Sequence, residues 1–285
     1  MKICRFNDGR LGVVQGDHLY DVTSARDQAL RGAKSDRWSD PVIANLPAVI
    51  AAIGESTRWG NPIPLNSVKL LSPVERPSKL VAAPTNYRDH IAEMQKVSAS
   101  NPVKRPQDIG TAGMFLKATS SLVGPSEGIK LRFLERRNDH EVELALIIGK
   151  TANQVAQADA LDYIAGYCIG LDITLRGPED RSFRKSIDTY SVLGPWMVTA
   201  DEIADPDNLR LRLGVNNEPR QNANTRDMVY SVRRLIEFAS AFYTLHPGDV
   251  VYTGTPSGVS AIKPGDTLIA EIDNIGRMHV AVGAA

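Results

Sequence analysis

The sequence predicts a mainly β, α+β protein, with a small β-rich domain over residues 1–70 and a larger domain over 71–285. Two observations predict this fold class. Short apolar stretches are separated by Gly and Pro turns, such as those at Gly194, Gly248 and Gly265. Only one long segment, 227–243, has convincing helical periodicity. Apolar residues make up 42% of the chain, so both domains can bury a core.

The first domain is predicted from short apolar runs that end at turn signals. Gly9 follows Asn-Asp, and Gly16 precedes Asp17, which is typical of tight turns between strands. A helix is expected over 44–53, where the residues are almost all apolar or small. The segment 61–66 contains two prolines and marks the boundary with the second domain.

In the second domain, residues 227–243 carry apolar side chains at helical spacing, and Thr225 or Asp227 is expected to cap the helix. Residues 98–113 have two prolines, several charges and no periodicity. Loops of this length are usually functional, so this segment is predicted to be a lid.

Bulk composition excludes several classes of function. The chain has 33 acidic and 33 basic residues, so no net field would attract nucleic acid or an anionic membrane. The two cysteines, Cys4 and Cys168, are far apart and fit neither a disulfide framework nor a zinc cluster. No signal peptide or membrane span is recognisable, and a cytoplasmic protein is expected.

A pair of glutamates lies at the start of a predicted buried strand. Residues 139–149 read Asp-His-Glu-Val-Glu-Leu-Ala-Leu-Ile-Ile-Gly, and the second half is apolar and β-branched. Side chains of a strand alternate between faces, so Glu141 and Glu143 share one face at roughly 7 Å between Cβ atoms. This separation allows both carboxylates to bind one ion. The alternative is that both lie on a solvated edge strand.

A lone aspartate in a second apolar strand favours the metal interpretation. Asp172 ends the run Ala-Gly-Tyr-Cys-Ile-Gly-Leu-Asp over 165–172, where an unpaired carboxylate would cost several kcal/mol. It therefore requires a cation. Three carboxylates with water suit Mg²⁺ or Mn²⁺, whereas zinc prefers nitrogen or sulfur ligands. The alternative is a structural ion pair between Asp172 and Arg176 or Lys185.

Four blocks of the sequence resemble the fumarylacetoacetate hydrolase family. They are Asn-Tyr-Arg-Asp-His-Ile-Ala-Glu over 86–93, Asp-His-Glu-Val-Glu over 139–143, Gly-Tyr-Cys-Ile-Gly-Leu-Asp over 166–172, and Pro-Gly-Asp-Val-Val-Tyr-Thr-Gly-Thr-Pro-Ser-Gly over 247–258. The resemblance extends from about residue 79 to the C-terminus. It implies a mixed β-sandwich roll that carries the catalytic site, a homodimer, and a divalent metal bound by Glu141, Glu143 and Asp172.

The same resemblance implies the catalytic and substrate-binding residues. The family's His-x-x-Glu pair corresponds to His90 and Glu93, and its active-site lysine to Lys185 in Lys-Ser-Ile-Asp. The Thr-Gly-Thr-Pro turn places Thr255 near a substrate carboxylate. Further candidate contacts with substrate are Arg176, Lys117, Gln221 and Tyr87.

This chain also departs from the usual family pattern. Pro84-Thr replaces the Gly-Leu that normally precedes Asn-Tyr, and Ala118 stands where a proline often follows the lysine. The acidic residue that often follows the arginine at 176 is replaced by Gly177. These differences leave the predicted metal ligands and the His90–Glu93 pair intact, but they make the substrate of any one relative an unsafe guide.

Together these residues predict an enzyme that cleaves a carbon–carbon bond in a small oxo-acid, an acylpyruvate or other 2,4-dioxo acid. A metal would stabilise the enolate, and His90, oriented by Glu93, would activate water. Lys185 would stabilise an oxyanion or supply a proton. Two alternatives stay open. The same site could serve isomerisation, hydration or decarboxylation of a 2-oxo acid, or the chain could be a catalytically silent oxo-acid-binding module.

Overall fold

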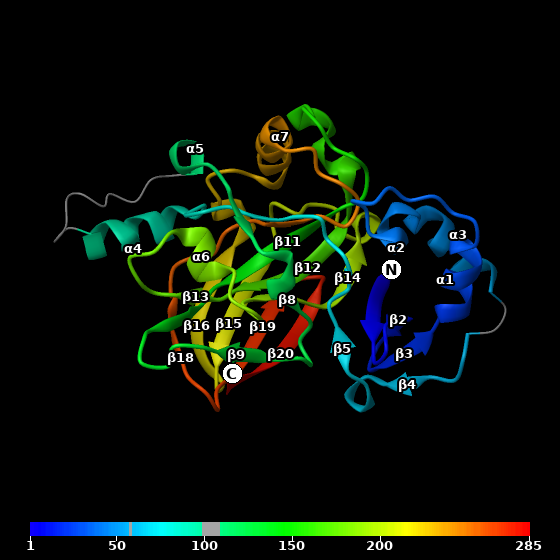
Figure 1. The fold of residues 1–285 in the computed structure, drawn as a ribbon, viewed down its shortest axis with the longest axis horizontal. Coiled ribbons are helices and arrows are strands. Elements are labelled where there is room, and N and C mark those ends of the chain that lie inside the picture. The colour runs from blue at the N-terminus through cyan, green and yellow to red at the C-terminus, as the bar shows by residue number, and fades with distance from the viewer. Residues whose placement is uncertain (57–58, 99–108) are drawn as a thin grey trace.

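The computed structural model describes all residues except 57–58 and 99–108. Within the described residues the largest sheet has 12 strands (Figure 1). Its strands, in chain order, are β1 (Lys2–Phe6), β2 (Arg10–Gln15), β3 (His18–Asp21), β4 (Ile63–Pro64), β5 (Leu70–Leu71), β6 (Leu80–Ala82), β7 (Phe115–Lys117), β8 (Leu122–Val123), β11 (Val142–Ile148), β12 (Ile164–Asp172), β14 (Ser191–Thr199) and β17 (Val250–Tyr252). The spine of the sheet runs in the order β4-β3-β2-β1-β14-β12-β11-β17-β6-β7.

Two smaller sheets and a set of short helices complete the described structure. The first small sheet consists of β13 (Thr174–Leu175), β10 (Asn138–His140) and β18 (Ser260–Ile262). The second consists of β16 (Glu218–Asn224), β15 (Arg210–Val215), β19 (Thr267–Ile272), β20 (Gly276–Ala284) and β9 (Ile129–Leu131). The α-helices are α1 (Thr23–Leu30), α2 (Pro41–Ala44), α3 (Leu46–Glu55), α4 (Arg88–Ser98), α5 (Ile109–Ala112), α6 (Arg181–Lys185) and α7 (Val232–Phe242). Short 3₁₀ helices are η1 (Leu65–Ser67), η2 (Thr119–Ser121), η3 (Gln157–Tyr163), η4 (Ala200–Glu202) and η5 (Thr225–Asp227).

The alternation of side chains along β11 explains how the layers pack. Leu144 and Leu146 belong to a core shared with Leu211 and Leu213 of the five-stranded sheet. Residues of the opposite face, such as Ala145, belong to a second core that also contains apolar residues of α3 and β2. Both faces of β11 are covered, and this explains why its sequence is a nearly continuous run of apolar residues. This packing of two sheets confirms the predicted mainly β fold.

The first 70 residues extend the large sheet. Strand β1 pairs antiparallel with β14, with Lys2 opposite Val198 and Ile3 opposite Met197. Strand β5 then pairs with β1. Strands from both sides of residue 70 are therefore hydrogen-bonded into one sheet. The division of the chain into two domains at this residue stays a prediction.

The helix predicted over 44–53 corresponds to α3, and the short helix α2 ends just before it, at Ala44. Asp40 caps α2 by accepting hydrogen bonds from the backbone N–H groups of Val42 and Ile43. Helix α3 begins at Leu46, two residues after the expected start, and extends to Glu55, two residues beyond the expected end. The eight-residue helix α1 has no clear apolar stripe, and the sequence analysis did not predict it.

The predicted start of the 227–243 helix and both predicted caps are wrong. Helix α7 begins at Val232, and Ser231 caps it by accepting a hydrogen bond from the Arg234 N–H. Residues 225–227 form the separate turn η5, capped by Asn224. The reason is a tertiary contact: the Tyr230 N–H donates to the side chain of Asn86 at 2.8 Å, which holds the preceding backbone out of the helix.

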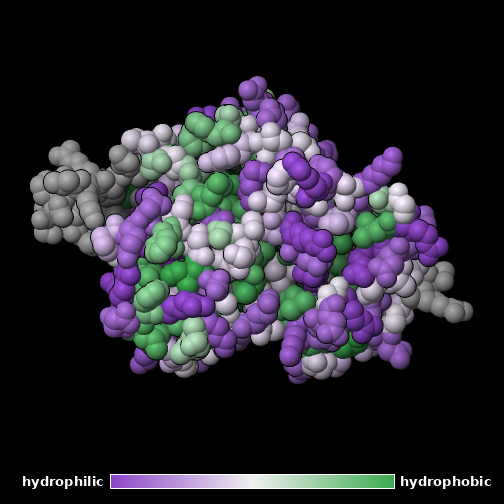
Figure 2. Space-filling view, in the orientation of Figure 1, coloured by the Kyte–Doolittle hydropathy of each residue, from purple (hydrophilic) through white to green (hydrophobic). Residues whose placement is uncertain are grey.

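Helix α4 enters the predicted lid segment and ends at Ser98, and α5 lies at its other end. Residues 99–108 lie outside the described residues, so the lid stays a prediction. No helix of the described chain is long and apolar enough to cross a membrane. Figure 2 shows hydrophilic residues spread over the visible face, with hydrophobic residues gathered in small areas between them.

Candidate active site

The register of β11 and β12 brings the three predicted carboxylates together. Glu143 pairs with Gly170, and the Asp172 N–H donates to the backbone oxygen of Glu141 at 2.9 Å. Because Asp172 lies two residues after Gly170, its side chain projects from the same face as Glu143. Oxygens of Glu141, Glu143 and Asp172 all lie within 4.8 Å of one another, and all three residues are buried. The predicted convergence is confirmed.

Glu141 is held in its charged form. Burial alone would raise its pKa, but Lys185 and Arg176 lower the pKa to about 2. Lys185 Nζ donates to Oε2 at 2.7 Å, and Arg176 donates to Oε1 at 3.4 Å. The hydroxyl of Thr174 donates to the same Oε1 at 3.0 Å. Glu141 therefore stays ionised at every physiological pH.

Glu143 is in the opposite electrostatic situation. Burial raises its pKa well above the usual range, and the neighbouring Asp172 and Glu141 raise it further. Among the described residues, the side chain accepts one hydrogen bond, from the Gly254 N–H at 2.6 Å. A buried carboxylate with two acidic neighbours and no basic side chain in hydrogen-bond contact suits a divalent cation. The all-oxygen ligand set fits Mg²⁺ or Mn²⁺.

Asp172 lies between two buried lysines. Lys185 Nζ donates to its Oδ2 at 2.7 Å, and Lys117 Nζ forms an ion pair with its Oδ1. Burial lowers the pKa of Lys117 despite this partner. Burial would also lower the pKa of Lys185, but Asp172 and Glu141 raise it above its ordinary value. The ion pair with Lys185, the alternative considered for Asp172, is thus present within the carboxylate cluster itself.

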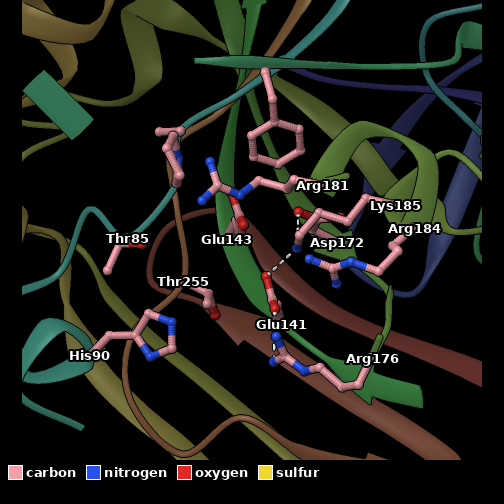
Figure 3. A pocket seen from close by; sticks show the side chains of 13 residues that line it. Thr85, His90, Glu141, Glu143, Asp172, Arg176, Arg181, Arg184, Lys185 and Thr255 are labelled. Carbon is pink, nitrogen blue, oxygen red and sulfur yellow. Dashed lines mark hydrogen bonds and ion pairs between the residues drawn. The ribbon is translucent and has the colours of Figure 1, made fainter. Parts of the chain in front are cut away.

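His90 and Glu93 lie one turn apart on α4, as their spacing predicted. His90 Nδ1 lies 3.1 Å from Glu93 Oε2. The Gly258 N–H donates to the other carboxylate oxygen of Glu93 at 3.5 Å, which ties α4 to the turn after β17. His90 lines the same pocket as Glu141, Glu143 and Asp172 (Figure 3). The histidine therefore faces the carboxylate cluster across the pocket.

Asn86 positions the beginning of α4. Its side-chain amide donates to the carbonyls of Tyr230 and Thr253, at 3.0 and 2.8 Å. Gly254 approaches so closely that an added Cβ would lie 2.7 Å from the Asn86 Cβ, and its φ of +96° favours glycine. The segment that begins at Asn86 and the Thr-Gly-Thr-Pro turn over 253–256 are therefore packed against each other.

Three of the predicted substrate contacts lie outside this pocket. Gln221 accepts from the Val142 N–H at 3.0 Å and donates to Thr255 Oγ1 and the Pro256 carbonyl, at 2.8 and 2.9 Å. The side-chain amide of Gln221 is therefore fully hydrogen-bonded to protein groups outside the pocket. Tyr87 is buried and forms a β-bridge with Met228, while Lys117 is buried against Asp172. Of the predicted contacts, Thr255 and Arg176 line the pocket.

The pocket also contains residues that the sequence analysis missed. These are Ala83, Pro84, Thr85, Phe115, Arg181 and Arg184. Arg181 and Arg184 belong to a run of charged residues around Lys185, and by sequence alone such a run also fits a solvated surface. For Arg181, its spacing of four residues from Lys185 on one short helix was the available signal, since i and i+4 share a helix face.

The family description "Fumarylacetoacetate (FAA) hydrolase C-terminal" matches residues 79–283, which include the carboxylates, the His90–Glu93 pair and Lys185. The chain belongs to the fumarylacetoacetate hydrolase family. The resemblance predicted from the four sequence blocks is thereby confirmed.

Individual family members are similar over most or all of the chain. Maleylpyruvate hydrolase from Aquipseudomonas alcaligenes is 52% identical over 284 residues, covering 99% of both chains. The crystal structure of maleylpyruvate hydrolase from Sphingobium sp. SYK-6, in complex with manganese(II) and pyruvate, has a TM-score of 0.84 at 39% identity, with both chains fully covered. Mitochondrial oxaloacetate tautomerase Fahd2a from Rattus norvegicus is 37% identical over 226 residues, covering 75% of this chain and 69% of the relative.

Proposed function

We propose that this enzyme hydrolyses the carbon–carbon bond of acylpyruvates, and that maleylpyruvate is its substrate. The observation that carries the proposal is the pocket in which His90 and Glu93 face three converging carboxylates. The full-length similarity to maleylpyruvate hydrolase supports the same reaction and the choice of acyl group.

In this reaction water adds to the carbonyl carbon of the acyl group. The bond between that carbon and the pyruvyl methylene then breaks, and its electron pair forms the enolate of pyruvate. The enolate takes up a proton on carbon. One maleylpyruvate and one water thus give one maleate and one pyruvate. The enzyme must therefore remove a proton from water, stabilise the enolate and return a proton.

Glu141, Glu143 and Asp172 would hold the divalent ion. When bound, Mn²⁺ or Mg²⁺ supplies Lewis-acid stabilisation of the enolate oxygen and a template for the 2-oxo acid. We propose Mn²⁺ as the preferred ion, because the related maleylpyruvate hydrolase structure contains manganese(II) and pyruvate.

His90 is the proposed general base. It is 8% exposed and lines the pocket, so it can reach a water molecule there while Glu93 fixes the orientation of its ring through Nδ1. With Nδ1 bonded to the carboxylate, Nε2 is free to accept the proton from water. The negative charge of Glu93 stabilises the resulting imidazolium.

Lys185 is the proposed source of positive charge beside the reacting oxygens. Its ammonium group bridges Glu141 and Asp172 at 2.7 Å each and donates to the Thr174 hydroxyl at 2.6 Å. These contacts hold Nζ at the edge of the carboxylate cluster. From there its positive charge can stabilise an oxyanion on the substrate, although its three N–H groups are already donated to protein oxygens. Thr255 and Arg176, which also line the pocket, are proposed to contact the substrate.

Product analysis tests this function. We expect the enzyme with Mn²⁺ or Mg²⁺ to convert maleylpyruvate to equal amounts of maleate and pyruvate, and chelation with EDTA to stop the reaction. Oxaloacetate, supplied separately, distinguishes the tautomerase and decarboxylase alternatives, since one gives the enol form and the other gives pyruvate and CO₂. Absence of pyruvate from maleylpyruvate, with either metal, would remove the hydrolase assignment. Metal binding without turnover of either substrate would favour the silent binding module.

We further propose a cytoplasmic homodimer, in agreement with the family resemblance. Light scattering of the purified enzyme tests the oligomeric state, with a dimer mass expected near twice the 31.0 kDa of the chain. A monomer at micromolar concentration that retains full activity would overturn this expectation.

A further inference from the structure

The pocket contains three arginines whose guanidinium groups are committed to different degrees. Arg176 donates to Asp139 at 2.6 Å and to Glu141 at 3.4 Å. Arg184 donates to the backbone carbonyls of Glu179 and Leu175, at 2.8 and 2.9 Å, and so fastens α6 to the chain before it. Arg181 has no hydrogen bond or ion pair with any residue that the structure describes. It is therefore the pocket arginine available to a ligand.

The surroundings of Arg181 orient this free guanidinium. Its Cζ lies 5.5 Å from the ring centroid of Phe115, which also lines the pocket. Stacking on an aromatic ring holds a guanidinium in place while leaving its N–H groups available. Figure 3 shows the side chain of Arg181 extending into the pocket, while Thr85 and His90 lie on the other side. An anionic group that enters the pocket would meet these N–H groups.

The spacing on α6 sets the distance between Arg181 and the metal ligands. Lys185 lies at the end of the helix that contacts Glu141 and Asp172. Arg181 is four residues earlier, which corresponds to about 6 Å along a helix axis. The two residues thus present two positive charges on one face, one beside the proposed metal and one a helical turn away.

The charges already present explain why a second cation is useful. Near the metal ligands, the carboxylates of Glu141, Glu143 and Asp172 are matched by Lys117, Lys185 and a divalent ion, and Arg176 is matched by Asp139. This cluster can therefore bind the single negative charge of a 2-oxo acid. An acyl chain that ends in a second carboxylate brings another buried negative charge, which needs a partner of its own.

We propose that Arg181 binds the distal carboxylate of the acyl chain and makes the enzyme selective for dicarboxylic acylpyruvates. This inference rests on the proposed function, because it places the oxo-acid end of the substrate at the metal. Arg181 acts on specificity, since a guanidinium can bind a carboxylate through two parallel hydrogen bonds. Acylpyruvates with a neutral tail, such as acetylpyruvate, leave this guanidinium unpaired.

The test compares two substrates in wild-type enzyme and the Arg181→Gln variant. For maleylpyruvate, the variant is expected to lose about 10- to 100-fold in kcat/KM, the factor expected for one charge-assisted pair. For acetylpyruvate, kcat/KM should change less than about threefold. Arg181→Lys should recover part of the lost activity, because the charge returns without the planar pair of donors. Equal losses on both substrates, or no loss on either, would overturn the proposal.

Arg184→Gln is the matched control, since it removes a guanidinium from the same helix that is committed to backbone carbonyls. It is expected to lower kcat/KM for both substrates by the same factor, through weaker attachment of α6. A loss confined to maleylpyruvate would assign the distal carboxylate to Arg184 instead.

Product binding keeps this inference separate from the proposed function. Titration of the Mn²⁺-loaded enzyme with maleate should show a 10- to 100-fold weaker Kd in Arg181→Gln, with pyruvate affinity unchanged within about threefold. If wild-type enzyme hydrolyses neither acylpyruvate but this difference is observed, the hydrolase assignment fails and the role of Arg181 stands. If maleate affinity is the same in both proteins, the role of Arg181 is wrong even where hydrolysis is observed.

Discussion

The carboxylate edge of β11 and β12 and the His90–Glu93 turn of α4 face the same pocket but are held in different ways. The carboxylates lie at the ends of central strands, and β11 pairs along its whole length with β12 and also with β17. Among the described residues, the start of α4 is attached through the side chain of Asn86 and the β-bridge between Tyr87 and Met228, and the Gly258 N–H donates to Glu93 at 3.5 Å. The difference teaches that the three carboxylates, here called the anchor, are positioned by strand pairing, whereas the proposed base is positioned by side-chain contacts of Asn86 and Glu93.

The largest effect is expected from removing one anchor carboxylate without changing its shape. Glu143→Gln should lower kcat/KM by about three orders of magnitude, because several kcal/mol of metal-derived stabilisation is lost. Mn²⁺ affinity, measured by calorimetry, should fall in parallel. Glu271→Gln is the control, since Glu271 pairs with Arg212 on the five-stranded sheet, away from the pocket. Unchanged Mn²⁺ affinity in Glu143→Gln would contradict the metal assignment.

Changes in the α4 pair should leave the anchor intact. His90→Ala is expected to reduce kcat by about 10²- to 10⁴-fold, the contribution of a general base, with Mn²⁺ affinity unchanged. Glu93→Gln should cost less, about 10- to 100-fold, because the base remains but loses its orienting partner. Asp89→Asn, an exposed neighbour on the same helix, is the control. If His90→Ala lost its metal as well, the two regions would not be independent.

The pKa values of Glu143 and Glu141 are shifted in opposite directions, and this predicts a pH effect on the stability of the metal-free enzyme. The pKa of Glu143 is raised in the folded state, so its stabilising contribution is present below the unfolded value near 4.5 and is lost as pH rises through the folded value. Between pH 5 and 8, with EDTA, wild-type enzyme should lose unfolding free energy relative to Glu143→Gln. Urea titrations at both pH values measure this. Parallel curves would show that Glu143 ionises normally in the fold.

Glu141 has the reverse dependence. Its pKa of about 2 means that its contribution is present above the unfolded value and is lost as pH falls from about 4.5 towards 2. Glu141→Gln should therefore destabilise the metal-free enzyme more at pH 7 than at pH 3, where part of the contribution has been lost. Unfolding by urea at pH 7 and pH 3 measures the difference, and equal destabilisation at both would contradict it.

The smallest effect on catalysis is expected from a substitution of Gln221, which lies outside the pocket. Gln221→Ala should lower the free energy of unfolding by about 1–3 kcal/mol, because the Val142 N–H and the Thr255 hydroxyl lose a buried partner. KM for maleylpyruvate should change less than about threefold, since the amide lies outside the pocket. A large rise in KM with unchanged stability would restore the substrate contact that the sequence suggested.

The sequence was sufficient for the carboxylate edge because strands have a fixed period. The spacing of Glu141 and Glu143 put both on one face, and a lone Asp172 in an apolar strand demanded a cation. The pairing of the two strands could not be read from periodicity alone, but the family resemblance implied that the three carboxylates hold one metal. The His90–Glu93 contact followed in the same way from helical spacing together with the resemblance.

Other features depended on contacts between distant segments, which local patterns do not encode. The predicted start of α7 was wrong because Asn86, far away in sequence, accepts a hydrogen bond from the Tyr230 N–H and holds this backbone outside the helix. Gln221 looked like a ligand residue, although its amide is consumed by Val142, Thr255 and Pro256. Arg181 was not selected, since only the fold shows which arginine of a basic run keeps its donors free.

The pairing of β1 with β14 has a consequence for dissecting the enzyme. β14 also pairs with β12, the strand that ends at Asp172. The N-terminal strands therefore cover the edge of β14, which is the direct neighbour of a strand that carries one of the three carboxylates. Cutting the chain at residue 70 would expose unpaired N–H and C=O groups along this edge, and such open edges recruit other strands. A fragment that keeps every catalytic residue would therefore tend to aggregate, and refolding experiments should use the whole polypeptide.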